Sequence, residues 1–160
     1  MSEIKNKVTL KIILFFSIFV LIVAYFIEYF LKHEPCNLCL IERIPYIISI
    51  IIISVCLFLK KFEKIIFILL TLIFIAGTVI SFYHFGIEKG FFEESFLCNL
   101  SNEIKILTKE DLLKELQKKI ISCKNVDFTI FGLSLASINT IVSIILSTIT
   151  FKKYLNYEKN

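Results

Sequence analysis

The chain has 160 residues, 57% of them hydrophobic, and its mean hydropathy is +0.82. A soluble domain of this length rarely has so apolar a composition, which argues against a water-soluble protein and favours a single membrane domain. The formal net charge of +4 comes from lysines that flank the apolar segments. Such flanking charge is typical of membrane topology and does not indicate a nucleic-acid partner.

Four segments are long, apolar and nearly free of charge. A bilayer core of about 30 Å needs about 20 apolar residues, and within lipid only helices or closed barrels satisfy the backbone. Because the runs are continuous rather than alternating, they predict helices. The predicted spans are about 10–31, 44–59, 65–87 and 128–151. The first is too long for a cleaved signal peptide and has no small-x-small site after it, so it is predicted to remain as an anchor.

The lysines indicate which way this all-α, four-helix transmembrane bundle sits. Lys and Arg in short flanks favour the cytoplasmic side. They precede the first span, fill the turn after the second and follow the fourth: Lys5, Lys7, Lys11, Lys60, Lys61, Lys64, Lys152, Lys153 and Lys159. Both termini are therefore predicted in the cytoplasm, and the loops at about 32–43 and 88–127 outside it.

Four of the five cysteines fall in these two outer loops. Cys36 and Cys39 lie in the first loop, and Cys98 and Cys123 lie in the second. Disulfides persist outside the bacterial cytoplasm, so two pairs of outward cysteines suggest two disulfides. Cys56 falls in the middle of the second span, where it is expected to pack as a small hydrophobic residue.

The first outer loop has the residues of a redox site. Pro45 suits the first turn of the second span, which places Cys39 near a helix N-terminus with Arg43 on the same face. The positive helix end and the guanidinium would then stabilise a thiolate at Cys39, suited to a lipid-soluble acceptor such as a quinone. Two simpler interpretations stay open: Arg43 binds lipid headgroups, or Cys36 and Cys39 are ligands of a structural zinc ion, although the usual second short-spaced pair is missing.

The second outer loop is predicted to contain an amphipathic helix. Thr108 and Asp111 resemble a capping box, and apolar residues follow at helical spacing: Leu112, Leu113, Leu116 and Ile120. Such a helix lies on the outer membrane surface or covers the end of the bundle. Before this loop, His84 ends the third span, at the membrane depth expected for Cys39 and Arg43.

Several of these motifs occur together in one known family. They are Pro35-Cys36-Asn37-Leu38-Cys39 with Glu42-Arg43 and Pro45-Tyr46, then Tyr83-His84-Phe85-Gly86-Ile87-Glu88 before Cys98, and Cys123 with Phe131-Gly132-Leu133-Ser134-Leu135-Ala136. Over nearly its whole length the chain resembles the disulfide bond formation protein B (DsbB) family of bacterial inner-membrane oxidoreductases.

The resemblance implies a route for electrons. Proteins of this family reoxidise DsbA, a soluble periplasmic protein of thioredoxin fold that donates disulfides. By likeness, DsbA attacks the Cys98–Cys123 disulfide and forms a mixed disulfide with Cys98. The Cys36–Cys39 disulfide then reoxidises that pair, and Cys39 passes the electrons to ubiquinone or menaquinone bound beside Arg43. His84 matches a family position near the quinone.

Two other classes of function are also compatible with two cysteine pairs on the outer side of the membrane. One is a membrane relay that carries reducing equivalents outward. Such a relay needs cysteines that can be reached from the cytoplasm. The sequence places only Cys56 away from the outer loops, inside the bilayer. The other is a non-enzymatic membrane protein with structural disulfides or zinc, which predicts no bound quinone.

Overall fold

The computed structural model describes residues 2–33, 35–59, 63–93, 98, 123–124, 129–130 and 132–158. Within these ranges it has four long helices: α1 (Ser2–Tyr29), α3 (Ile44–Leu59), α4 (Glu63–Glu88) and α7 (Leu135–Glu158). Four segments of the described chain are long enough and apolar enough to cross a bilayer: Asn6–Tyr29, Asn37–Phe58, Lys64–Glu88 and Leu135–Asn156. The predicted four-helix transmembrane bundle is therefore confirmed, whereas the predicted amphipathic helix lies outside the described residues.

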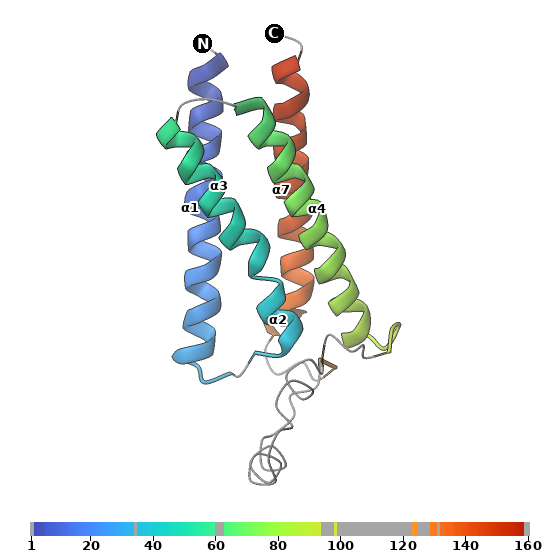
Figure 1. Cartoon of the computed structure of the whole chain (residues 1–160). Helices are drawn as coiled ribbons and strands as arrows, with labels where there is room; N and C mark the ends of the chain where they lie inside the picture. Colours follow the sequence, from blue (N-terminus) through green and yellow to red (C-terminus); the bar gives the residue numbers. More distant parts are fainter. Residues whose placement is uncertain are drawn as a thin grey trace, which may run out of the picture.

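Both chain ends lie at one end of this bundle. The end of α3 and the start of α4 lie at that same end, and the short helix α2 (Asn37–Ile41) lies at the opposite end (Figure 1). The lysine-flanked ends of the helices are thus together, as the topology prediction requires. Which of the two ends faces the cytoplasm stays a prediction.

The fourth long helix begins later than the sequence suggested, at Leu135 rather than at about 128. A short antiparallel hairpin precedes it, made of β1 (Thr129–Ile130) and β2 (Leu133–Ser134). Gly132 in the hairpin turn has φ 78°, a left-handed conformation that a helix does not allow and that glycine adopts at little cost. Ser134 then caps α7 by accepting a hydrogen bond from the Ser137 N–H at 3.2 Å.

The helices pack in pairs, with α4 along α7 and α1 along α3, and α3 also contacts α4. Hydroxyl groups join them inside the bundle: Ser17 bonds Ser49 at 3.3 Å, and Thr71 donates to Thr150 at 2.9 Å. Small polar side chains of this kind are typical of helix contacts in membranes, where apolar packing alone gives no advantage over lipid.

The core of the bundle is apolar and includes Cys56, as predicted. Its buried members are Leu10, Ile13, Tyr46, Ile53, Cys56, Ile66, Phe67, Leu70, Phe74 and Leu146. Close packing at α3 and α4 depends on Gly77, because an added Cβ would lie 3.2 Å from Pro45 Cγ. Large apolar side chains such as Phe15 and Phe58 are exposed on the outside of the bundle, where lipid would cover them.

Candidate redox site

Cys36 begins the site because it caps α2. Its backbone is extended, with φ −70° and ψ 166°, and its sulfur accepts a hydrogen bond from the Cys39 N–H at 3.4 Å. The two sulfur atoms lie 3.0 Å apart and are not bonded covalently. A disulfide needs about 2.05 Å, so a movement of about 1 Å would close it. The C-x-x-C spacing and the tight first turn of α2 therefore hold two thiols ready for oxidation.

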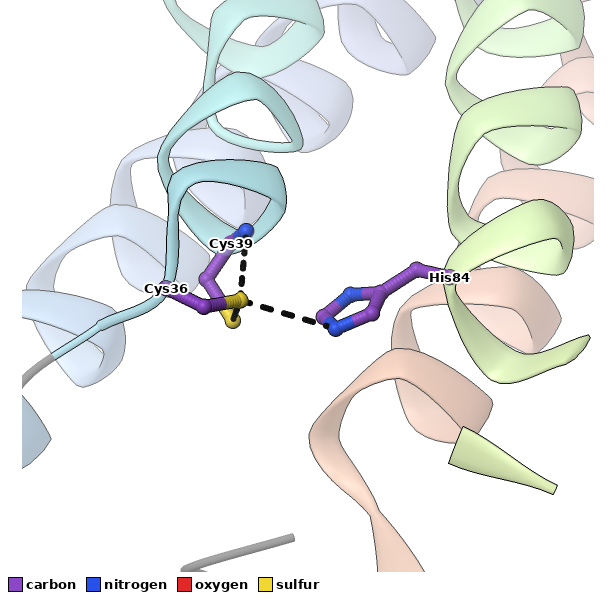
Figure 2. Close-up of side chains that lie close together, drawn as sticks. All are labelled: Cys36, Cys39 and His84. Carbon is purple, nitrogen blue, oxygen red and sulfur yellow. Dashed lines mark hydrogen bonds between the residues drawn. The ribbon is translucent and has the colours of Figure 1, made fainter. Parts of the chain in front are cut away.

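His84 reaches these sulfurs from a different helix. It lies near the end of α4, and its imidazole points across the bundle toward Cys36 and Cys39 (Figure 2). Its Nε2 is 3.6 Å from the Cys36 sulfur, and the side chain is almost fully buried. The sequence placed His84 at the membrane depth of Cys39, and the structure brings it into contact with the other cysteine of the pair.

A buried chain of hydrogen bonds fixes the orientation of His84. Its Nδ1 lies 2.7 Å from Glu42 Oε1, and the other oxygen of Glu42 accepts a bond from Asn139 Nδ2 at 2.8 Å. The Tyr46 hydroxyl donates to Asn139 Oδ1 at 2.5 Å. Because the Glu42 carboxylate can only accept a hydrogen bond, Nδ1 of His84 carries a proton and donates it. The other ring nitrogen, Nε2, faces the Cys36 sulfur. The imidazole is therefore placed to exchange a proton with Cys36.

The hydrogen bonds converge on Cys36 rather than on Cys39. The Cys39 side chain makes the strongest of them and, together with His84 and against the opposing effect of burial, lowers the pKa of Cys36 to about 4. These contacts favour a thiolate at Cys36, whereas the sequence suggested one at Cys39. The expected stabilisation of Cys39 by Arg43 also assumed one helix, but α2 ends at Ile41 and α3 begins at Ile44.

Arg43 lines the same cavity but bonds to α1. Its Nη1 donates to Glu28 Oε2 at 2.6 Å, and its guanidinium carbon lies 4.9 Å from the centre of the Tyr25 ring. The expected contact between Arg43 and a Cys39 thiolate is therefore replaced by an ion pair with Glu28. Held at two points, the guanidinium keeps a defined position at the edge of the cavity.

A cavity of about 330 Å³ connects the sulfurs with the space between α1 and α7. Its apolar part is lined by Phe16, Phe19, Val20, Val23, Ile138 and Val142. Its polar end is lined by Cys36, Cys39, Glu42, Arg43, His84, Glu88 and Asn139. A cavity with one apolar part and one polar, thiol-bearing end suits a ligand with a polar ring and a hydrocarbon tail.

The second cysteine pair lies against the first. Cys98 and Cys123 form a disulfide, and both pack into one buried cluster with Cys36 and with Leu38 and Ile87. All four cysteines that the sequence proposed as a redox set are thus brought together at one end of the bundle. The structure holds the disulfide in the second pair and two thiols in the first.

Glu42 and Asn139 had no role in the sequence interpretation. Glu42 was part of a recognised motif, and Asn139 lies in the apolar fourth span, 97 positions away in the chain. A carboxylate and an amide within or beside membrane helices are costly unless they are paired, which is a sequence signal for a buried polar contact. Glu42 follows α2, His84 lies in α4 and Asn139 lies in α7, so these contacts form only in the folded bundle.

The fold and the site define a class of protein: a four-helix membrane protein with a buried C-x-x-C dithiol beside a second disulfide. The family model for disulfide bond formation protein DsbB matches residues 6–152, and the chain belongs to this family. A Rickettsia prowazekii (strain Madrid E) protein named uncharacterized protein RP370 is 29% identical over 144 residues, which are 89% of this chain and 84% of that protein. No solved structure matches the chain. Family membership implies a membrane protein of disulfide-bond formation.

Proposed function

We propose that the protein is a thiol oxidase that takes two electrons from a reduced, DsbA-like periplasmic protein and passes them to ubiquinone or menaquinone. The observation that supports this most is the contact between the two cysteine pairs. Cys36 lies in the same buried cluster as Cys98 and Cys123, and Cys123 also lines the cavity at Cys39. Thiol–disulfide exchange requires a thiolate to attack a sulfur directly, so the two pairs must meet as they do here.

The exchange steps follow from this contact. The donor's dithiol reduces the Cys98–Cys123 disulfide and leaves with a disulfide of its own. The resulting thiols reduce a Cys36–Cys39 disulfide, so that the second pair is oxidised again and the first pair holds two thiols. The arrangement of one disulfide and two thiols in the structure corresponds to the stage after this transfer. Two electrons and two protons move in each step, so the exchange is balanced.

The cavity fits the proposed acceptor. Its volume of about 330 Å³ lies within the ordinary range for small-ligand sites, and its apolar part suits an isoprenoid tail between α1 and α7. Arg43 would hold a ring carbonyl, and His84 would take up the proton of Cys36 with Glu42 stabilising the imidazolium. A bound quinone would supply the two-electron acceptor that regenerates the Cys36–Cys39 disulfide.

The compartment follows from the same chemistry. A DsbA-type donor is a strong oxidant, at about −120 mV, so its reoxidation needs an acceptor stronger than glutathione disulfide. Quinones of the bacterial inner membrane meet this need. We infer a protein of that membrane with both termini in the cytoplasm and the cysteines on the periplasmic side, which the lysine-flanked helix ends support.

The test is single replacement of the four cysteines. Cys36, Cys39, Cys98 and Cys123 are each changed to Ala, and reoxidation of a reduced DsbA-like protein is measured with a soluble ubiquinone analogue. Each variant should lose quinone-dependent turnover, whereas Cys56→Ala, in the apolar core, is the matched control and should keep it. Full turnover in any of the four variants would refute the proposed function.

A further inference from the structure

We propose that the reduced Cys36–Cys39 pair and His84 form a binding site for a thiophilic divalent cation of the zinc class. The three possible ligand atoms, two sulfurs and Nε2, all lie within 4.8 Å of one another. Two thiolates and one imidazole are a common ligand set for zinc in proteins. This inference goes beyond the proposed function and rests on the cluster alone.

The distances in the cluster are close to those of a loaded site. With metal–sulfur and metal–nitrogen bonds of about 2.3 and 2.0 Å, neighbouring ligand atoms of a tetrahedral zinc ion lie about 3.3–3.8 Å apart. Cys36 Sγ is 3.6 Å from His84 Nε2, within that range. The two sulfurs, at 3.0 Å, would need to separate by less than 1 Å. The site therefore needs a small side-chain adjustment and no movement of the helices.

The surroundings of His84 provide an independent argument. Imidazoles that bind a metal through one nitrogen almost always donate the other N–H to a carboxylate or a carbonyl. Here Nδ1 meets Glu42 Oε1 at 2.7 Å, and Asn139 holds the second oxygen of Glu42 in turn. The lone pair of the neutral imidazole is thereby directed from Nε2 toward the sulfurs. Glu42 acts as a positioning residue for the metal site.

A buried carboxylate lies beside the cluster without being part of it. Glu88 lies one turn after His84, and its Oε1 is 3.9 Å from Nε2. The other carboxylate oxygen, Oε2, is buried and has no hydrogen-bond partner among the described residues. A buried carboxylate oxygen without a partner is costly. A cation held by Cys36, Cys39 and His84 would place a positive charge near this carboxylate and would leave its fourth coordination position to water in the cavity.

The cation and the disulfide exclude each other. Binding forms two metal–thiolate bonds and releases two protons, one from the Cys39 thiol and one that Cys36 and His84 share, with no transfer of electrons. Oxidation of the pair joins the same two sulfurs and removes both thiolate ligands. The site therefore exists only in the reduced state, and an occupied site holds Cys36 and Cys39 reduced. Thiophilic cations should then inhibit any electron transfer that passes through this pair.

Cadmium is a suitable probe because its thiolate complexes absorb in the ultraviolet. The full chain with Cys98→Ala and Cys123→Ala, which leaves one redox pair, is reduced in detergent without oxygen and titrated with Cd²⁺. We expect saturation at one ion per chain. His84→Ala and Glu42→Ala should weaken binding at least about tenfold. His33→Ala, which removes the other histidine of the cavity lining, is the matched control and should bind as the parent does.

The same parent oxidised with diamide should show no cadmium band, and this comparison is made on one protein without a further substitution. A band that persists after oxidation, no saturation at one ion per chain, or equal affinities of the His84→Ala and His33→Ala proteins would overturn the proposal. No quinone or donor protein is present in the titration. Oxidase turnover is measured separately, on the chain with all its cysteines. Absence of cadmium binding together with intact turnover of that chain counts against the metal site alone, and the reverse result counts against the proposed function alone.

Discussion

Asn37 Nδ2 donates a hydrogen bond of 2.9 Å to the backbone carbonyl of Cys98. The bond joins the first residue of α2 to the segment of the second disulfide, 61 positions further along the chain. The two cysteine pairs are thus held together by a polar contact as well as by the apolar packing of Leu38 and Ile87.

Removing this contact should loosen the second disulfide. Asn37→Ala loses a hydrogen bond of about 1 kcal/mol, so we expect reduction of Cys98–Cys123 by dithiothreitol to be about fivefold faster. The rate is measured by alkylation and mass spectrometry. Leu40→Ala, at an exposed position of the same helix, is the control and should leave the rate unchanged. An unchanged rate in Asn37→Ala would show that the contact does not restrain the disulfide.

The pKa of Cys36 predicts how its reactivity depends on pH. A thiolate persists above its pKa, so Cys36 in the reduced protein should stay ionised from neutral pH down to mildly acidic pH and gain a proton only near pH 4. Ultraviolet thiolate absorbance, compared with that of Cys36→Ser, measures this titration. A midpoint near the value of an ordinary thiol, about 8.5, would contradict the assignment.

Glu42 should matter through its charge as well as its shape. Glu42→Gln keeps an oxygen that can accept from His84 Nδ1 but cannot stabilise a protonated imidazole as a carboxylate does. Because bonds to charged groups contribute about 1.5–3 kcal/mol, we expect quinone-dependent turnover to fall about 10- to 100-fold. The pH profile of turnover, measured with the same donor, should shift in Glu42→Gln. A merely structural role for Glu42 would lower the amount of folded protein and leave that profile in place.

The ion pair of Arg43 predicts an effect on quinone affinity. A lysine at this position keeps the positive charge but loses the planar group that bonds Glu28 and lies over Tyr25. Arg43→Lys should therefore raise the KM for quinone several-fold and change kcat less. Steady-state kinetics with a soluble quinone analogue separate the two constants. Equal KM values in the parent and the variant would show that Arg43 does not contribute to quinone binding.

Gly77 tests the packing of the bundle. Gly77→Val places two methyl groups against Pro45 Cγ, which already lies 3.2 Å from the position of an added Cβ. Overpacking of this kind costs about 1–3 kcal/mol of folding free energy. Thermal unfolding in detergent measures the loss. Val79→Leu, which enlarges a side chain on the exposed side of the same helix, should leave the midpoint nearly unchanged.

The sequence predicted the parts of this molecule that depend on composition. Four continuous apolar runs suffice to predict four membrane helices, because lipid leaves the backbone few alternatives. Cysteine spacing and the neighbouring motifs were enough to select Cys36, Cys39, Cys98 and Cys123. The position of His84 at the end of a span predicted its depth, and the structure brings it next to Cys36, while its place beside a quinone stays a prediction.

The rest depended on geometry that spacing does not determine. The start of α7 moved because Gly132 turns the chain into a hairpin, and the apolar composition of that segment does not distinguish a helix from a short strand. A thiolate is favoured at Cys36 rather than at Cys39 because His84, from a distant part of the chain, contacts the Cys36 sulfur. Glu42 and Asn139 meet across two helices, and no local pattern specifies such a long-range contact.

The exposed fractions of Cys98 and Cys123 are 5% and 2%. In thiol–disulfide exchange, the attacking thiolate must approach a sulfur in line with the S–S bond that breaks. Because both sulfurs are buried, a small thiol in solution cannot reach this position unless the surrounding residues move. Under the proposed function, only a partner that docks and displaces this cover gains access. The burial would thereby make the oxidase selective by kinetics, and it would protect bystander proteins in the same compartment from unwanted crosslinks.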